Sequence, residues 1–366
     1  MRTVRAMNAP ETTKTSAQPG ATDQRRRAER PSFGTRLARG LAFDKVGAIY
    51  VWLLICVVFA IWVPDRFPQV ATIKQVLNAN AITALAALSI VIPLTTRTFD
   101  LSFAFTMTMS GVTAAHFVAI GWSVPAGLAA GVVVALLIGL VNGIVVVGMQ
   151  IDSFIATLAT GSLIQALITM ATGDTPILSL KLAGGFADFA QTEVGGITLP
   201  VLYAVVVALA IWYLLEHTAT GRRLYATGFN PDAAKLAGVR TDRLRFMSLV
   251  VSGGLAGFAG IVLASQLQSG SPTAGAPYLL PAFAAAFLGA TQLKHGRFNA
   301  WGTIIAVLLL GTGTTGLALA NAPQWAANMF VGVVLIASLA VTGIQRRATT
   351  GRKRFAWARL RRAKAA

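Results

Sequence analysis

Long apolar segments dominate this sequence and restrict it to one broad class of fold. Between Val46 and Ile344 the chain alternates runs of mostly apolar residues with short polar connections. A helix of about 20 apolar residues matches the hydrocarbon thickness of a bilayer. Only 12% of the 366 residues are charged, whereas about a quarter are charged in soluble domains. The sequence therefore predicts an all-α polytopic membrane protein.

The apolar segments predict ten transmembrane helices. In order they cover residues 46–63, 79–94, 101–120, 124–148, 153–171, 199–215, 246–267, 279–293, 300–320 and 326–344. The eighth is short and contains Pro281, so it is either a crossing or a re-entrant or broken segment. A polar but helix-compatible piece, 72–78, leads into the second span.

The distribution of basic residues predicts the orientation. Of the 31 Lys and Arg residues, nine precede Asp44 and nine follow Ile344. Ten spans place both termini on one side of the membrane, and the basic ends favour the cytoplasm. The 216–245 connection, which has six Lys or Arg residues, falls on that same side. The long connection 173–200 then lies outside, where it can offer a surface to an external partner.

Three regions follow from this pattern. Residues 1–43 form a polar, basic tail that we expect to be disordered, 44–344 form the transmembrane domain, and 345–366 form a second basic tail. The net charge of +18 sits mainly in these tails, which favours contact with anionic membrane lipid and not with nucleic acid. The first apolar run begins too late for a signal peptide. Cys56 is the only cysteine, so the chain has no internal disulfide.

One inner segment carries helix-boundary signals. It comprises Asn230, Pro231, Asp232, Ala233, Ala234, Lys235, Leu236, Ala237 and Gly238. Asn230 can cap a helix, Pro231 suits the first helical position, and Gly238 can supply the left-handed stop. A helix of about two turns needs a packing partner. Two interpretations remain open: a solvated interfacial turn, or a docking helix for another protein.

Ion coupling and enzymatic chemistry find little support in the residues. Asp100, Asp152 and Glu216 all fall at the edges of the predicted spans, whereas ion-driven carriers usually hold acids inside the membrane. No G-x-x-x-x-G-K-[ST] phosphate loop occurs, and the histidines lack metal-ligand spacing. We therefore predict no catalytic residue, no metal site and no cofactor in this chain.

Small and polar residues within the spans have two possible roles. Gly139 with Gly143, and Gly253 with Gly257, form G-x-x-x-G pairs that let helices approach closely. The literal G-x-G-x-x-G at 311–316 lies inside an apolar span, so we interpret it as helix packing and not as a dinucleotide site. Polar and aromatic residues are candidates either for a translocation pathway or for contacts between helices; they are Asn142, Phe154, Thr157 and Gln165.

Several motifs resemble the permease subunits of ribose, xylose and galactose type ABC importers. Phe99-Asp100-Leu101-Ser102 is similar to "IDLSVG" in that family, and Gly221-Arg222-Arg223-Leu224-Tyr225 with Asn230 and Ala237-Gly238-Val239 is similar to "GRRLYAIGGNPEAARLAGI". The segments Val141-Asn142-Gly143 with 151–158, 269–275, and 288–291 before Gly296-Arg297 also match. The resemblance covers residues 46–344. Phe103 stands where the family often has glycine, and Asp152 where it has proline.

The resemblance implies a function. Such subunits pair as dimers in the bacterial inner membrane, most simply as a homodimer. They receive a monosaccharide from a periplasmic binding protein and are driven by cytoplasmic ATPase subunits that bind ATP and magnesium. The resemblance implies that residues 230–238 form the coupling helix, and it adds Asp100 and Phe103 to the pathway candidates. A pentose, a hexose or a polyol fits equally well. The alternatives are a self-contained secondary carrier for a small neutral solute, and a channel or receptor.

Overall fold

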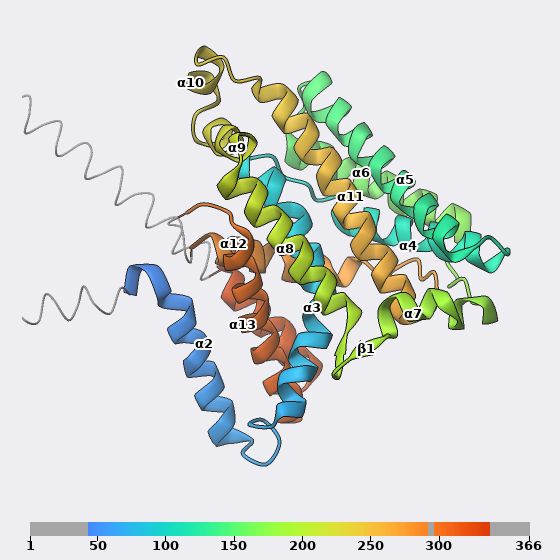
Figure 1. Cartoon of the computed structure of the whole chain (residues 1–366), viewed down its shortest axis with the longest axis vertical. Coiled ribbons are helices and arrows are strands. Elements are labelled where there is room, and N and C mark those ends of the chain that lie inside the picture. The colour runs from blue at the N-terminus through green and yellow to red at the C-terminus, as the bar shows by residue number, and fades with distance from the viewer. Residues whose placement is uncertain (1–42, 292–295, 337–366) are drawn as a thin grey trace, which may run out of the picture. The chain divides into compact units, whose positions relative to one another are not determined.

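The computed structural model describes residues 43–291 and 296–336, and the helices from Asp44 onward belong to one unit (Figure 1). Several predictions fall outside the described residues. These are the basic tails (1–43, apart from Phe43, and 345–366), the position of both termini, and the end of the tenth span after residue 336. The short connection 292–295 also falls outside them.

The described chain is built almost entirely of helices. In order they are α2 (Phe43–Trp62), α3 (Val70–Thr95), α4 (Phe103–Ala119), α5 (Val124–Gly143), the π-helical turn η1 (Ile144–Gly148), α6 (Ser153–Thr172), η2 (Leu180–Ala183), α7 (Gly185–Gln191), α8 (Leu199–His217), α9 (Ala219–Phe229), α10 (Pro231–Leu236), α11 (Thr241–Leu267), η3 (Ala276–Tyr278), α12 (Leu279–Thr291) and α13 (Ala300–Leu319). A last helix covers Gln324–Ile336. Strands β1 (Glu193–Val194) and β2 (Ile197–Thr198) pair antiparallel, with Glu193 opposite Thr198.

Within residues 43–291 and 296–336, six helices are long and apolar enough to cross a membrane. They are Val70–Thr95, Val124–Gly148, Ser153–Thr172, Leu199–His217, Thr241–Leu267 and Ala300–Leu319. Four shorter apolar helices, Tyr50–Trp62, Phe103–Ala119, Ala276–Thr291 and Gln324–Ile336, fall on the other predicted spans. Length and composition therefore support a crossing for six of the ten. The 13 described residues of α12 rise only about 20 Å, which is less than the hydrocarbon thickness.

The structure differs from the sequence prediction at three helix boundaries. The helix-compatible piece 72–78 is part of the same helix as the second span, because α3 runs without interruption from Val70, before the expected start at residue 79. Within the predicted 216–245 connection, residues 219–229 form the helix α9, because the Thr218 hydroxyl accepts a hydrogen bond from the Gly221 N–H and caps the helix. Helix α11 begins at Thr241, before the apolar part that we expected from residue 246.

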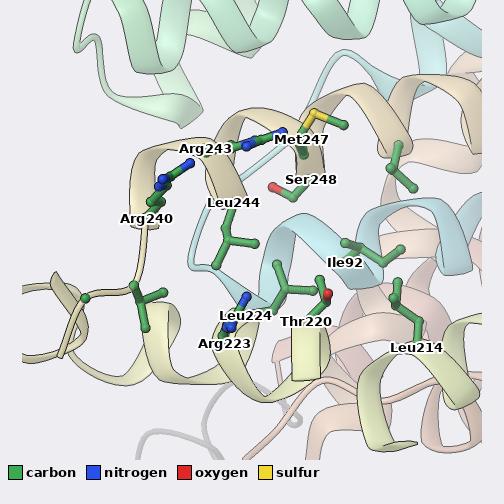
Figure 2. A pocket seen from close by; sticks show the side chains of 13 residues that line it. Ile92, Leu214, Thr220, Arg223, Leu224, Arg240, Arg243, Leu244, Met247 and Ser248 are labelled. Atoms are coloured by element: carbon green, nitrogen blue, oxygen red, sulfur yellow. The ribbon is translucent and has the colours of Figure 1, made fainter. Parts of the chain in front are cut away.

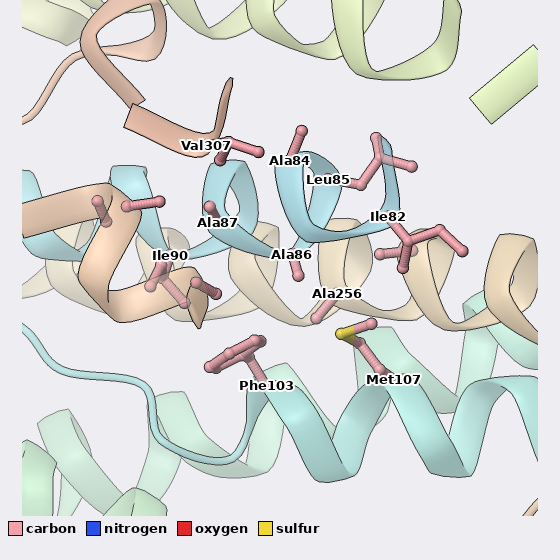
Figure 3. Packing of buried hydrophobic residues seen from close by; sticks show 14 of the residues in the cluster. Ile82, Ala84, Leu85, Ala86, Ala87, Ile90, Phe103, Met107, Ala256 and Val307 are labelled. Atoms are coloured by element: carbon pink, nitrogen blue, oxygen red, sulfur yellow. The ribbon is translucent and has the colours of Figure 1, made fainter. Parts of the chain in front are cut away.

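Helix α3 lies at the centre of the described helices. Figure 3 shows Ala86 and Ile90 of α3 facing Phe103 and Met107 of α4, with Ala256 of α11 beside them. These five side chains are fully buried. The other side of α3 is buried against α12 and α13. A helix that is apolar on all sides is expected in such a central position.

Helices α5 and α11 touch through the two predicted G-x-x-x-G pairs. A Cβ atom on Gly253 would lie 2.6 Å from the Ala135 carbonyl oxygen and 2.9 Å from the Cα atom of Gly139. A Cβ atom on Gly257 would overlap the Ala135 side chain. The prediction that these glycines allow close helix packing is therefore confirmed, and the two pairs meet each other across a single helix contact.

The G-x-G-x-x-G sequence of α13 also serves helix packing, as predicted. Gly311 faces Asn80, Gly313 faces Phe330, and Gly316 faces Phe59. The Trp52 indole N–H donates to the Thr312 hydroxyl at 2.9 Å, which joins α2 to the same stretch of α13. The small residues of α13 thus allow close packing against three neighbouring helices: α3, the last helix and α2.

The α5–α11 contact yields a stability prediction. Gly253→Ala places a methyl group against the Ala135 carbonyl, and we expect it to lower the free energy of unfolding by about 1–3 kcal/mol. Thermal unfolding of the detergent-solubilised protein measures the change. Gly332→Ala is the matched control, because a Cβ atom there meets no atom within 4 Å. Equal melting temperatures for the two variants would contradict the packing assignment.

Candidate functional site

Two glycines let α9 lie directly on the ends of the longer helices. Gly221 contacts the Leu215 carbonyl at the end of α8, and Gly228 contacts the Thr95 carbonyl at the end of α3. Between them, Leu224 is 3% exposed and packs in the cluster formed by α3 and α8. Any larger residue at either glycine would displace α9, so the position of this connecting helix is fixed by close backbone contact.

The predicted capping of α10 is confirmed. The Asn230 side-chain oxygen accepts a hydrogen bond from the Ala233 N–H at 3.1 Å. Gly238 has φ +81°, and the Val239 N–H donates to the Ala234 carbonyl at 2.9 Å, which closes the helix with a left-handed turn. An ion pair of 3.3 Å between Lys235 and Asp242 ties α10 to the first turn of α11. The cap, the left-handed turn and the ion pair thus define both ends of the short helix.

One face of α10 is exposed in the described part of the chain. Ala234 is buried, whereas Leu236 is 92% exposed and Phe229, just before the helix, is 56% exposed. The Arg297 guanidinium lies over the Phe229 ring at 5.1 Å from its centroid, so this ring is held in place. Exposed apolar side chains on a rigid support are typical of a protein–protein contact.

A half-buried tyrosine, Tyr225, connects α9 to the segment that precedes α13. The Tyr225 hydroxyl donates to the Phe298 carbonyl at 2.7 Å, and Arg297 lies over the Tyr225 ring. Burial and the charge of Glu216 raise the pKa of Tyr225 to about 12, although Arg297 acts in the opposite direction. The hydroxyl therefore stays protonated at physiological pH and keeps donating this hydrogen bond.

The connection between α3 and α4, residues 96–102, is mostly buried, apart from the exposed Arg97, and is rich in hydrogen bonds. One carboxylate oxygen of Asp100 accepts from the Ser102 N–H at 3.1 Å and from the Ser102 hydroxyl at 2.7 Å. The other accepts from the Ser252 hydroxyl of α11 at 2.7 Å. Asp100 is 1% exposed. The sequence placed it at a span edge, and it does follow the end of α3, but this connection folds inward against α11.

The network extends into α5 and α6. The Asn142 amide donates to the Ser102 hydroxyl at 2.7 Å, and the Thr160 hydroxyl donates to the Asn142 oxygen at 2.6 Å. Backbone groups of the connection are also satisfied by α6, because the Leu101 N–H donates to the Thr157 hydroxyl at 3.0 Å. The Phe99 N–H likewise donates to the Ser153 hydroxyl. Four helices are thereby joined through one irregular segment.

The six pathway candidates separate into two groups. Asp100, Asn142 and Thr157 are brought together in the network, and Phe103 packs edge-to-face on Phe283; all four are at most 1% exposed. Phe154 is 49% exposed and contacts Phe99 edge-to-face, while the Gln165 amide donates to the Pro272 carbonyl at 3.4 Å. In this conformation the buried four connect helices and line no open space.

Sequence reasoning missed several members of this network. Ser252, Ser102 and Thr160 were not singled out, although the Ser102 hydroxyl belongs to the motif around Asp100 and Ser252 directly precedes Gly253. A small polar residue beside a close-packing glycine is the signal that could have found Ser252. Over the described residues, no group of three or more His, Cys, Asp or Glu side chains is placed to bind a metal ion.

The network yields a second prediction. Asp100→Ala removes the acceptor of three hydrogen bonds and leaves buried donors unpaired, which costs about 1–3 kcal/mol or more. Asp100→Asn keeps the size and one acceptor oxygen, and we expect a smaller loss. Thermal unfolding compares the melting temperatures of both variants with that of Asp152→Ala, which changes an aspartate at an exposed helix cap. A stable Asp100→Ala protein would show that the network is dispensable.

Comparison with known proteins places these features in a family. Residues 72–339 match the family model described as branched-chain amino acid transport system / permease component. The chain is 30% identical over 291 residues to the ribose import permease protein RbsC of Escherichia coli K12, covering 79% of this chain and 91% of that protein. It is 31% identical to RbsC of Bacillus subtilis, covering 80% of this chain and 91% of that protein.

A third relative is named for the import of a different compound. The autoinducer 2 import system permease protein LsrC of Salmonella paratyphi B is 30% identical over 279 residues, which covers 76% of this chain and 80% of that protein. The matches include both the capped segment 230–238 and the buried connection 96–102. The resemblance found in the sequence is thus confirmed, and the chain belongs to the ABC importer permease family, as a multi-pass protein of the bacterial inner membrane.

Proposed function

We propose that this chain is the membrane subunit of an ABC importer that moves a monosaccharide delivered by a periplasmic binding protein. The observation that carries the proposal is the match to ribose permeases over about nine tenths of their length. A pentose or a hexose is the cargo class that we favour. The chain acts as a transport component, and a separate subunit supplies ATP hydrolysis with bound ATP and magnesium.

The orientation forms part of the proposal. The four shorter apolar helices complete ten crossings, so that both termini lie in the cytoplasm. The segment 216–245, from the end of α8 to the first turns of α11, then faces the cytoplasm, where its six Lys and Arg residues agree with the positive-inside rule. Residues 173–198, with α7 and the β1–β2 hairpin, face the periplasm. Leu180, which is 95% exposed there, is available to the binding protein.

Helix α10 is the proposed contact with the ATPase subunit. Its exposed Leu236 and the neighbouring Phe229 would enter a groove of that partner, which supplies the packing that a six-residue helix lacks. Movement of α10 reaches α11 through the Lys235–Asp242 pair and the closing turn at Gly238. From α11 it reaches Asp100 through Ser252. A second copy of the chain completes the translocation path in this proposal.

The path itself is assigned to residues that the sequence indicated. Phe154 is the exposed candidate, and its contact with Phe99 places an aromatic surface beside the buried Asp100. Aromatic faces suit the apolar faces of sugar rings. Phe103, Asn142 and Thr157 are buried and would join the path only after the helices around residues 96–102 move apart, whereas Gln165 is half-buried.

Uptake into proteoliposomes tests the function. We expect the chain, combined with its ATPase subunit and binding protein, to transport a radiolabelled pentose or hexose only when ATP is present on the side of the membrane that carries the ATPase subunit. A panel of ribose, xylose, galactose, allose and leucine identifies the cargo. Uptake of leucine alone would replace the sugar assignment. Uptake by the purified chain under an ion gradient, without nucleotide, would establish the secondary carrier instead.

Substitution of Leu236 tests the docking surface. Leu236→Asp places a charge where the partner needs an apolar contact, and because the side chain is exposed we expect no loss of stability. The amount of ATPase subunit that co-purifies with the chain should fall about tenfold or more, because burying an unpaired charge in the interface costs several kcal/mol. Leu180→Asp is the matched control, an equally exposed leucine at the proposed outer face. Undiminished co-purification of the Leu236→Asp protein would refute the assignment.

A further inference from the structure

A cavity of about 640 Å³ opens between α9 and the start of α11, next to the connection that follows α10. Figure 2 shows its walls: α9 on one side, the start of α11 on the other, and α3 and α8 behind. The residues that connect α10 to α11, Gly238 to Arg240, form part of the rim. Cavities of roughly 300–1,000 Å³ are typical of small-ligand sites.

Three arginines from two sides surround the mouth of this cavity. Arg223 projects from α9, whereas Arg240 and Arg243 lie at the beginning of α11 (Figure 2). No acidic residue lines the cavity. Across the described part of the chain, the three guanidinium groups make no hydrogen bond or ion pair. Arg245, by contrast, bonds to Thr98, and Arg297 covers two aromatic rings.

The inner wall of the cavity is mostly apolar, with the hydroxyl side chains Thr220 and Ser248 as its polar members. It is formed by Ile92 of α3, Leu214 of α8, Leu224 of α9, and Leu244, Met247 and Val251 of α11. From Leu244 to Val251 this wall follows α11 for about 10 Å. Met247 is 47% exposed and Val251 37% exposed, so the wall continues onto the outer, apolar surface of the helices. The cavity is therefore cationic at one end and apolar at the other.

We propose that this cavity binds an anionic phospholipid of the inner leaflet. Arginine pairs with phosphate through paired hydrogen bonds, and basic pockets at the cytoplasmic ends of membrane helices attract acidic head groups. The apolar wall takes the first part of the acyl chains. A free phosphate would use the arginines but leave this wall exposed, and an acidic protein loop would not extend toward the hydrocarbon layer. The lipid identity rests on the proposed orientation.

The position of the site gives the lipid a role in coupling. The head group would hold Arg223 on α9 together with Arg240 and Arg243 on α11, and it would thereby brace the short connection that follows α10. The α10–α11 connection otherwise depends on its backbone turn and one exposed ion pair. Exposed ion pairs contribute little stability on their own. A bound anionic lipid would therefore stiffen the transmission of movement from α10 to α11.

Lipid titration of the purified full chain tests the proposal. Native mass spectrometry in detergent measures binding of phosphatidylglycerol, phosphatidylcholine and glycerol 3-phosphate to the wild type and to an R223Q/R240Q/R243Q variant. We expect wild type to retain phosphatidylglycerol in preference to phosphatidylcholine, and the variant to bind it about tenfold more weakly or worse. Glycerol 3-phosphate should compete poorly, because it lacks the acyl chains.

The matched control is R66Q/R97Q/R222Q, which removes the same charge from three exposed arginines that do not line this cavity. It should bind phosphatidylglycerol like wild type. A lysine triple variant at positions 223, 240 and 243 keeps the charge and should retain most binding, which separates loss of the site from misfolding. Equal weakening in the control, equal binding of phosphatidylcholine, or full competition by glycerol 3-phosphate would overturn the proposal.

Addition of the ATPase subunit provides one further outcome. If that subunit displaces phosphatidylglycerol completely, the cavity is a protein-docking site and the lipid assignment is wrong; if lipid and subunit bind together, the assignment is supported. Because lipid binding is measured on the chain alone, it does not depend on transport. A protein that retains the lipid but fails in ATP-driven uptake counts against the proposed function and not against the site.

Discussion

The structure depends on satisfying the irregular backbone of residues 96–102 inside a helical protein. Within an apolar surrounding, free backbone N–H groups are costly, so non-helical segments persist only where protein groups replace water. Here hydroxyls of α6 accept from Phe99 and Leu101, and Asp100 accepts from Ser102 and Ser252. Helices α5, α6 and α11 are thereby hydrogen-bonded to this single connection, which leads into α4.

Helix α11 is the element on which the separate contacts converge. Its first turn holds α10, its middle holds Asp100 through Ser252, and its glycines bring it against α5. Farther along, the Ser265 hydroxyl donates to the Phe186 carbonyl of α7. A 27-residue helix extends about 40 Å. A rigid helix with contacts at both ends can carry a movement of α10 to the opposite face, provided that the α10–α11 connection is stiff.

Local patterns predicted local structure well. The capping of α10 followed from Asn230, Pro231 and Gly238, and the apolar runs marked the long helices, because these signals lie within a few adjacent residues. The burial of Asp100 did not follow from sequence, since it depends on hydroxyls about 150 residues away in α11 and on neighbours in α5 and α6. Helix α9 was missed because its apolar face is narrow, and two glycine contacts fix its position.

In the described part of the chain, the arginines around α9 and α11 fall into two groups, those whose side chains bond to or stack on other groups of the chain and those whose side chains do not. Arg297 and Arg245 are each engaged within the chain, on aromatic rings or on the Thr98 hydroxyl, and so contribute to the fold. Arg223, Arg240 and Arg243 are exposed around one cavity, so their side chains remain available to an anion. In the proposed orientation, these three arginines serve recognition as well as the positive-inside pattern.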